Sequence, residues 1–318
     1  MIQQCCAAGE IHTGTPSGRV DKVHGLDCYI ASPPAGTEPE GVVVILPDVF
    51  GWELVNTRIL ADAYAAKGNY LVYLPELQDG MAFDPSLLTS LANLEASGLT
   101  ALLSRAYHLA RLASWWIPFA RANTDAAVRA RLHPFLAAIR THPATGRLPV
   151  AAAGFCWGGY WCFQLAADAA ADRVEVESES GKRQVLSLVD AVFTAHPANM
   201  RVPEDVEAVR LPLSVAAAAI DKMFPKEDVD VARAILERKV REEGQRHEVV
   251  WPEKDLLLLR QSSLTNEAFH RLTPINFRVF HEDQFLGAAP AISLSLHETL
   301  GDVFELSATA DQFDMAHP

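Results

Sequence analysis

One stretch in the middle of the chain constrains the fold more than any other: residues 149–160, with the sequence PVAAAGFCWGGY. Its run of small and β-branched residues, 150–153, predicts a buried strand, and a helix-like run begins at about residue 160. Cys156 falls between them, with glycine two residues before it and two and three residues after it. The stretch therefore predicts a sharp strand–turn–helix unit that carries a thiol at its turn.

This pattern is that of the nucleophile elbow of α/β-hydrolases, with cysteine in the serine position. The glycines have a physical reason, because a Cβ atom at those positions would collide with the neighbouring strand or helix. The alternative is that Cys156 is a small hydrophobic residue packed in a tight βα turn. The strand before the motif and the helix after it favour the nucleophile.

Strand-like and helix-like runs alternate from about residue 41 to residue 251. The continuous β-branched run 41–46 is typical of a strand buried on both faces of a parallel sheet. A helix that closes at Gly68 and a strand over 70–74 complete a βαβ unit. We therefore predict an α/β protein with the α/β-hydrolase fold: a mostly parallel sheet, helices on both faces, and functional residues at the carboxyl ends of strands.

Other segments carry weaker signals. We expect an edge strand over 23–30, mostly helix over 84–146, a loop over the charged residues 172–184 and a strand over 185–193. The aromatic patch 115–119 is interrupted by proline; core packing of a connecting helix is the favoured interpretation, and a substrate-facing cap is the alternative. Further helices are expected over 125–140 and 229–241, and a short strand over 248–251.

Composition excludes several classes of protein. A hydrophobic content of 49% allows a large core, and a net charge of −13 argues against nucleic-acid or anionic-membrane partners. There is no run of 18 apolar residues and no signal-peptide pattern at the N-terminus. The five scattered cysteines predict cytosolic thiols rather than disulfides, and none has zinc-like spacing with histidine. We expect a cytoplasmic protein without metal or cofactor; the sequence does not determine its oligomeric state.

Cysteine chemistry requires partners for the thiol. A thiol attacks a carbonyl best as thiolate, so a base or an environment that lowers its pKa is needed. In this fold the acid follows the nucleophile in the chain, and Asp221, at the end of an apolar run, is the candidate; its alternative is an ordinary loop or N-cap aspartate. Two backbone N–H groups, those of Trp157 and Val49, are expected to form the oxyanion hole.

Several motifs together resemble the dienelactone hydrolase family, a cysteine branch of the α/β-hydrolases, over roughly residues 5–251. The segments that carry this resemblance are 5–16 (CCAAGEIHTGTP), 47–51 (PDVFG), 75–80 (PELQDG), 154–159 (GFCWGG), 196–197 (HP) and 221–225 (DKMFP). The resemblance implies a domain over 5–252 that hydrolyses a small-molecule lactone or ester through a thioester on Cys156, like a carboxymethylenebutenolidase, with Asp221 as the triad acid. Asp48 stands where family members carry a glutamate beside the resting thiol.

The chain departs from the family at the catalytic histidine. The family's His-Gly-Phe motif does not occur after Asp221, and leucines 256–259 stand in its place. We therefore treat 253–318 as a divergent C-terminal segment that packs poorly. His281, after the strand-like run 275–280, is a candidate replacement, whereas His247 begins a strand and so lies at the wrong end. His196 ends a strand on the catalytic side, but a structural histidine before proline is the favoured interpretation.

Two functions remain open from the sequence. The first is a cysteine hydrolase, which is impaired if no histidine completes the triad: it would acylate slowly, deacylate more slowly still, and accumulate a thioester. The second is a non-catalytic protein of the same fold that binds a small molecule or a partner. The histidine is the feature that separates them.

Overall fold

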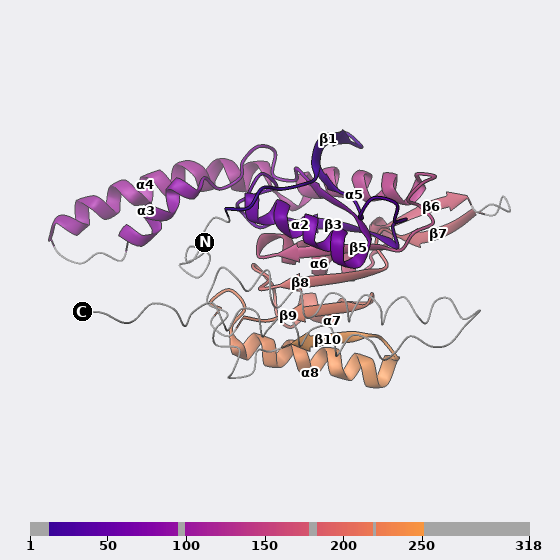
Figure 1. The fold of residues 1–318 in the computed structure, drawn as a ribbon. Coiled ribbons are helices and arrows are strands. Elements are labelled where there is room, and N and C mark those ends of the chain that lie inside the picture. Colours follow the sequence, from indigo (N-terminus) through magenta and orange to yellow (C-terminus); the bar gives the residue numbers. More distant parts are fainter. Residues whose placement is uncertain (1–12, 95–98, 178–182, 219–220, 251–318) are drawn as a thin grey trace, which may run out of the picture. The chain divides into compact units, whose positions relative to one another are not determined.

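The computed structural model describes residues 13–94, 99–177, 183–218 and 221–250, and within them the chain builds one large sheet (Figure 1). The sheet has eight strands in the order β1-β2-β4-β3-β5-β8-β9-β10. Strands β4 to β10 of this order run parallel, whereas β1 and β2 are antiparallel at one edge. The strands are β1 (Arg19–Val23), β2 (Leu26–Ala31), β3 (Gly41–Leu46), β4 (Tyr70–Pro75), β5 (Val150–Phe155), β8 (Ala191–Ala195), β9 (Leu213–Ala216) and β10 (His247–Val250). The predicted mostly parallel sheet is confirmed.

The connections between parallel strands carry the helices, as βαβ crossovers require. The helices are α2 (Val55–Gly68), α3 (Leu88–Asn93), α4 (Leu99–Ala122), α5 (Asp125–Thr141), α6 (Trp157–Ala166), α7 (Glu204–Glu207) and α8 (Lys226–Glu243), with 3₁₀ turns η1 (Pro85–Leu87) and η2 (Ala170–Asp172). A separate two-stranded antiparallel ribbon consists of β6 (Arg173–Glu177) and β7 (Arg183–Ser187).

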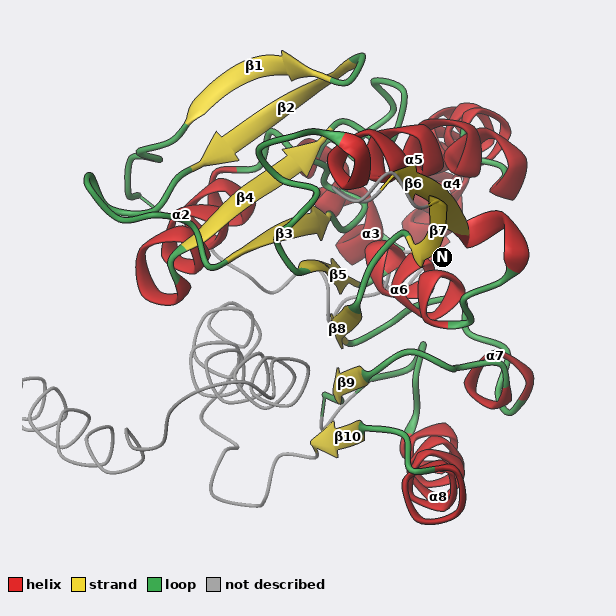
Figure 2. Cartoon of the chain, turned by 90° about the vertical axis from the view of Figure 1, so that its right-hand side faces the viewer, coloured by secondary structure: helices red, strands yellow, loops and turns green. Residues whose placement is uncertain are grey.

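Both faces of the sheet are covered by helices, and β3 shows why. Its side chains alternate between two hydrophobic clusters, so that Val44 and Leu46 lie in one and Val43 and Ile45 in the other. The first cluster contains buried residues of α5, α6 and α8, and the second contains those of α2. Figure 2 shows α2 on one side of the strands and α5 and α6 on the other. Because β3 is buried on both sides, its sequence reads as a continuous apolar run.

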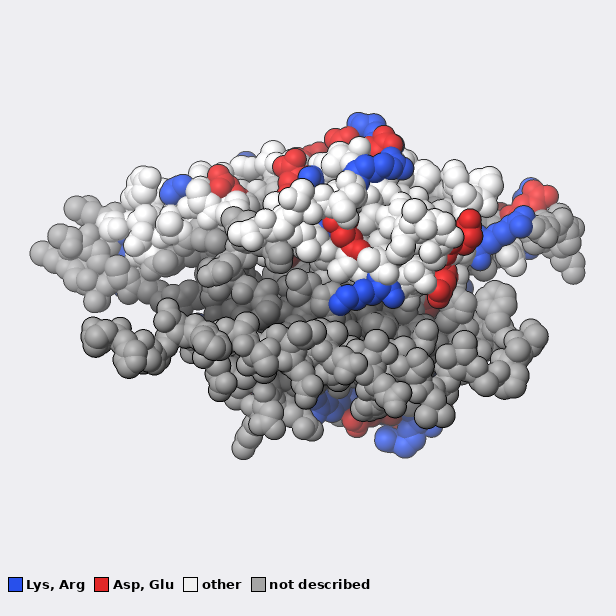
Figure 3. Space-filling view, viewed as in Figure 1, with Lys and Arg blue, Asp and Glu red and all other residues white. Residues whose placement is uncertain are grey.

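Charges are distributed over the surface without one dominant sign in the view of Figure 3, where lysine and arginine side chains alternate with acidic ones over the described residues. The net charge of the whole chain is nevertheless −13. Among the described helices, none is both long enough and apolar enough to cross a membrane.

Two predicted elements at the N-terminal side need correction. The expected single strand over 23–30 is a hairpin of β1 and β2, because His24 and Gly25 both take left-handed backbone conformations (φ 47° and 90°) and turn the chain. Helix α2 does include Gly68, but its left-handed C-cap is Asn69 (φ 52°), a role that asparagine also accepts.

The charged segment 172–184 was expected to be a loop, and this is wrong. Residues 173–177 (RVEVE) alternate polar and apolar side chains, which is the period of a strand, and they pair with β7. The expected strand over 185–193 is in fact two strands, β7 and β8, separated at Leu188–Asp190. Pro118 lies within the aromatic patch 115–119 but does not end the helix that carries it, because α4 continues to Ala122.

Candidate active site

The elbow around Cys156 has the backbone that its sequence predicts. Cys156 follows β5 directly, precedes α6 and has φ 51° and ψ −111°, a conformation that non-glycine residues rarely adopt. Its side chain is buried, and the residue is 8% exposed. Strain of this kind at the junction of a strand and a helix is typical of functional sites. The structure thus places the thiol on a βα turn and not in mid-helix.

The glycines around Cys156 are required by close contacts. A Cβ atom on Gly154 would lie 2.3 Å from the carbonyl oxygen of Gly158, and one on Gly158 would lie 2.0 Å from that of Leu46. A Cβ on Gly159 would lie 2.8 Å from the Cα of Pro197. The first turn of α6 therefore packs against the end of β3 and against the segment after β8, with no room for larger residues.

The two expected oxyanion donors lie in the segments that this packing brings together. Val49 is buried in the turn after β3, and Trp157 is the first residue of α6. Within the described residues neither backbone N–H donates a hydrogen bond, although Val49 accepts one from Phe83 N–H at 2.6 Å. Buried N–H groups are normally bonded, so two unpaired ones beside a thiol are suited to receive an oxyanion.

Asp48 lies at the carboxyl end of β3, directly before Val49. Its side chain is half-buried, and its Oδ1 accepts the N–H of Phe50 at 2.9 Å. Burial raises the pKa of Asp48 to about 6, while the Phe50 N–H and the charge of His196 act in the opposite direction. The carbonyl of Asp48 accepts from Gln78 Nε2 at 2.8 Å, which fixes the turn. The Phe50 N–H thus holds the Asp48 side chain in place, and the pKa of this side chain lies close to neutral pH.

Asp221 lies on the connection between β9 and α8. Its Oδ1 accepts the N–H groups of Met223 and Phe224 at 2.7 and 3.2 Å, so the side chain folds the loop that leads into α8. It is half-buried and is not the N-cap of α8, which is Pro225. His281, the histidine suggested as its partner, lies outside the described residues.

Two other histidines are placed by the structure. His247 begins β10, away from the carboxyl ends of the strands, and burial lowers its pKa to about 4. His196 directly follows β8 and has φ 40°, so it lies at the carboxyl end of the strand next to β5. Sequence reasoning favoured a structural role for His196; only the pairing of β5 with β8 reveals its position beside the elbow.

An aromatic cluster connects the elbow to α4. Phe119 is buried and its ring centroid lies 5.9 Å from that of Trp157, while Trp115 stacks on Phe119 at 4.8 Å. Trp116 and Ile117 are exposed instead. One face of the helix at 115–119 therefore packs into the core, which is the interpretation that the sequence favoured. The opposite face of the helix is exposed to solvent.

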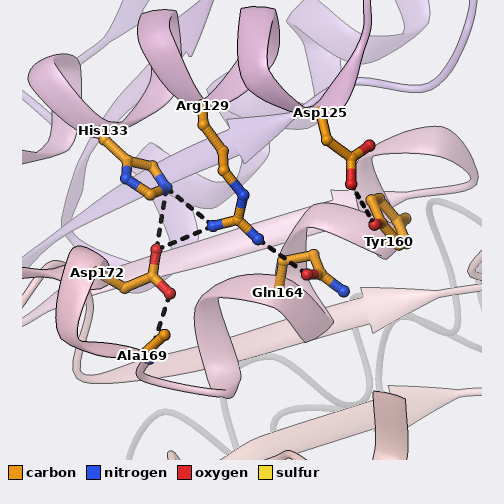
Figure 4. A network of polar contacts seen from close by, with 7 residues as sticks. All are labelled: Asp125, Arg129, His133, Tyr160, Gln164, Ala169 and Asp172. Carbon is orange, nitrogen blue, oxygen red and sulfur yellow. Dashed lines mark hydrogen bonds and ion pairs between the residues drawn. The ribbon is translucent and has the colours of Figure 1, made fainter. Parts of the chain in front are cut away.

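A polar network holds α6 against α5 (Figure 4). Asp172 is buried and accepts from Arg129 at 3.2 Å, and it pairs with His133 at 2.9 Å. Arg129 also donates to Gln164 on α6 at 2.9 Å, and Tyr160 on α6 donates to Asp125 at 2.8 Å. Because a buried carboxylate needs such partners, this network fixes α6, and with it the position of Cys156. Sequence reasoning did not identify it.

The described residues offer no group of three or more histidine, cysteine or acidic side chains arranged to hold a metal ion. A parallel sheet, a strained strand–turn–helix and candidate site residues at the carboxyl ends of strands define the class of the protein as an α/β-hydrolase fold.

Comparison with known proteins narrows this class. The model of the dienelactone hydrolase family matches residues 26–176. The hydrolase pyvD of Aspergillus violaceofuscus is 26% identical over 233 residues, 73% of this chain and 76% of that protein. Dienlactone hydrolase 1 of Gibberella moniliformis is 24% identical over 226 residues, 70% of this chain and 71% of that protein. The resemblance to the dienelactone hydrolase family is confirmed, and it supports a hydrolase.

A solved structure agrees on the fold. The crystal structure of a proposed dienelactone hydrolase from Klebsiella pneumoniae subsp. pneumoniae superposes with a TM-score of 0.52. The two chains are 18% identical, and the match covers 80% of this chain and 92% of that one. At this identity the likeness concerns the fold, and it agrees with the arrangement of strands and helices described above.

Proposed function

We propose that this protein hydrolyses small carboxylic esters or lactones and that Cys156 is its nucleophile. The observation that carries the proposal is the left-handed backbone of Cys156 (φ 51°) at the junction of β5 and α6. A cysteine that served only as a small core residue would gain nothing from this strain, which costs about 1–3 kcal/mol. The family match supports hydrolysis over the alternative of a non-catalytic binding protein.

The proposed reaction begins with attack of the Cys156 sulfur on the carbonyl carbon. The N–H groups of Val49 and Trp157 would receive the oxyanion, and loss of the alcohol would leave a thioester. Water would then release the acid and restore the thiol. Asp221 is proposed as the acid that orients a histidine, because its Oδ2 makes no hydrogen bond within the described residues.

Rapid mixing with p-nitrophenyl acetate, acid quenching and peptide mass spectrometry test the proposal. We expect an acetyl group on the Cys156 peptide in the native protein and none there in Cys156→Ala. Cys162→Ala is the matched control, since it removes a second buried thiol from the same helix and should leave acylation at Cys156 in place. Turnover that survives in Cys156→Ala, or an acetyl group on a different residue only, would refute the assignment.

A further inference from the structure

The proposed cysteine hydrolase lacks a histidine at the position where its family carries one, yet His196 directly follows β8, the strand that pairs with the strand of the elbow. We propose that His196 is the general base for Cys156, in place of a histidine from the C-terminal segment. This inference rests on the proposed function, because it assigns the proton acceptor of the same nucleophile.

The register of the sheet places the segments that carry the two residues side by side. Strands β5 and β8 are parallel, and their ladder ends with the pair of Phe155 and Ala195, so Cys156 and His196 directly follow the paired ends of the two strands. Neighbouring strands lie about 4.8 Å apart, so the two backbones are still close together where the strands end. On the other side of β5, Leu46 pairs with Gly154, and Asp48 follows Leu46 by two residues, as Cys156 follows Gly154. Cys156 thus lies between the two chain segments that carry Asp48 and His196.

Backbone hydrogen bonds hold the His196 segment against Cys156. The N–H of Cys156 donates to the carbonyl of Ala195 at 3.2 Å, and the N–H of Ala198 donates to the carbonyl of Cys156 at 3.0 Å. These two bonds flank His196 on both sides in the chain. The contact between Pro197 and Gly159 described above closes the same segment onto α6. These backbone bonds therefore hold the His196 segment against the elbow, and His196 can move away only if they break.

The conformation and surroundings of His196 do not fit a purely structural role. Its backbone is in the left-handed region (φ 40°), an unfavourable conformation for a histidine before proline. Its side chain is half-buried, and within the described residues its ring nitrogens make no hydrogen bond. A histidine that stabilises a core normally has its ring nitrogens bonded. The ring of His196 is thus available to exchange a proton.

Each proton that moves in such a reaction has a donor and an acceptor. The imidazole of His196 takes the proton of the Cys156 thiol as the S–C bond to the ester carbonyl forms and the carbonyl π electrons move to oxygen. The imidazolium returns this proton to the leaving alkoxide as the C–O bond breaks, which gives the alcohol and the thioester. In the second half of the reaction, the oxygen of water attacks the thioester while His196 takes a proton from that water. His196 returns the proton to the sulfur when the C–S bond breaks, which restores the thiol.

The test compares His196→Asn with His281→Asn by single-turnover acylation of Cys156 with p-nitrophenyl acetate. Asparagine tolerates the left-handed conformation of residue 196 and has no comparable base. We expect His196→Asn to acylate about 100-fold more slowly, which is the low end for loss of a general base, and added imidazole to restore part of the rate. His281→Asn should stay within about twofold of the native rate, since no step is assigned to it.

Two results would overturn the inference: a His196→Asn rate within threefold of native, or a loss in His281→Asn as large as the one expected at His196. If His196→Asn does not fold, carbethoxylation of the native protein with diethyl pyrocarbonate replaces it, and loss of acylation must follow modification of the His196 peptide. A native protein that acylates Cys156 while both histidine variants are unimpaired refutes only this inference. A native protein with no acylation at Cys156 refutes the proposed function and this inference with it.

Discussion

The N-cap and the second turn of α6 carry the same chemical group, a thiol, in opposite surroundings. Cys156 directly precedes the helix on a strained turn, and Asp48 and His196 lie in the segments that follow the neighbouring strands β3 and β8. Cys162, six residues later, is fully buried, and its thiol donates to the carbonyl of Phe193 at 3.2 Å. Burial raises the pKa of Cys162 far above its usual value. Placement on the helix, and not residue type, therefore separates a candidate nucleophile from a core residue.

The largest effect is expected from Gly158→Ala, which would break the turn that distinguishes the two cysteines. The new Cβ would lie 2.0 Å from the carbonyl oxygen of Leu46, which is backbone and cannot yield easily. We expect a loss of about 3 kcal/mol or more in the free energy of unfolding and loss of acylation at Cys156. Urea denaturation measures the first, and Gly41→Ala, whose nearest contact would be 3.2 Å, is the control. Equal stability of both variants would contradict the packing described here.

Next in size is the difference in thiol reactivity. Burial raises the pKa of Cys28 from 9.0 to about 12, which lowers its thiolate fraction at neutral pH by about a thousandfold, and Cys162 is affected in the same direction. We expect iodoacetamide to label Cys156 about 100-fold faster than Cys28 or Cys162 in the folded protein. Peptide mapping over time gives the three rates. Labelling of Cys162 as fast as Cys156 would remove the distinction between the two turns of α6.

A smaller effect concerns the stability cost of Asp48 next to the elbow. Because its pKa rises from 3.8 to about 6 on folding, ionised Asp48 destabilises the protein above pH 6, and this penalty disappears as the pH falls from 6 to 4. Asn can still accept the Phe50 N–H. We expect Asp48→Asn to be more stable by about 1–2 kcal/mol at neutral pH and unchanged near pH 4.

Thermal or urea unfolding of native and Asp48→Asn protein at the two pH values checks this. Asp84→Asn is the matched control, because Asp84 accepts the N–H of Ser86 two residues on, as Asp48 accepts that of Phe50, but lies on an exposed turn. If Asp48→Asn is instead less stable than the native protein at neutral pH, the contacts of the carboxylate stabilise the fold by more than its burial costs.

The smallest effect is expected from Cys162→Ala. It removes one buried sulfur and a weak hydrogen bond, so we expect a loss of about 1–2 kcal/mol in the free energy of unfolding. Acylation of Cys156 should stay within about twofold of the native rate, because the first turn of α6 is untouched. Denaturation curves and the rapid-quench assay give the two values. A large loss of acylation would mean that the second turn participates in the site.

The sequence by itself determined the fold class and the elbow. The continuous apolar run of β3 predicts a strand buried on both faces, and the glycines around Cys156 predict a turn without room for a Cβ; both patterns are local, so they can be read without the rest of the chain. Local signals failed where the chain turns through His24 and Gly25 and where residues 173–177 pair with β7, since their partners are distant or the turn depends on backbone angles.

Only the tertiary structure revealed that, among the described residues, His196 directly follows the strand that pairs with the strand of the elbow. His196 is 40 residues from Cys156 in the sequence, and nothing near it distinguishes it from a structural histidine before proline. The pairing of β5 with β8 brings the segments that carry the two residues together, and the segment after β3, which carries Asp48, lies on the other side of β5. A site at the carboxyl ends of parallel strands is assembled by strand order and register, and these are properties of the folded sheet rather than of any single segment.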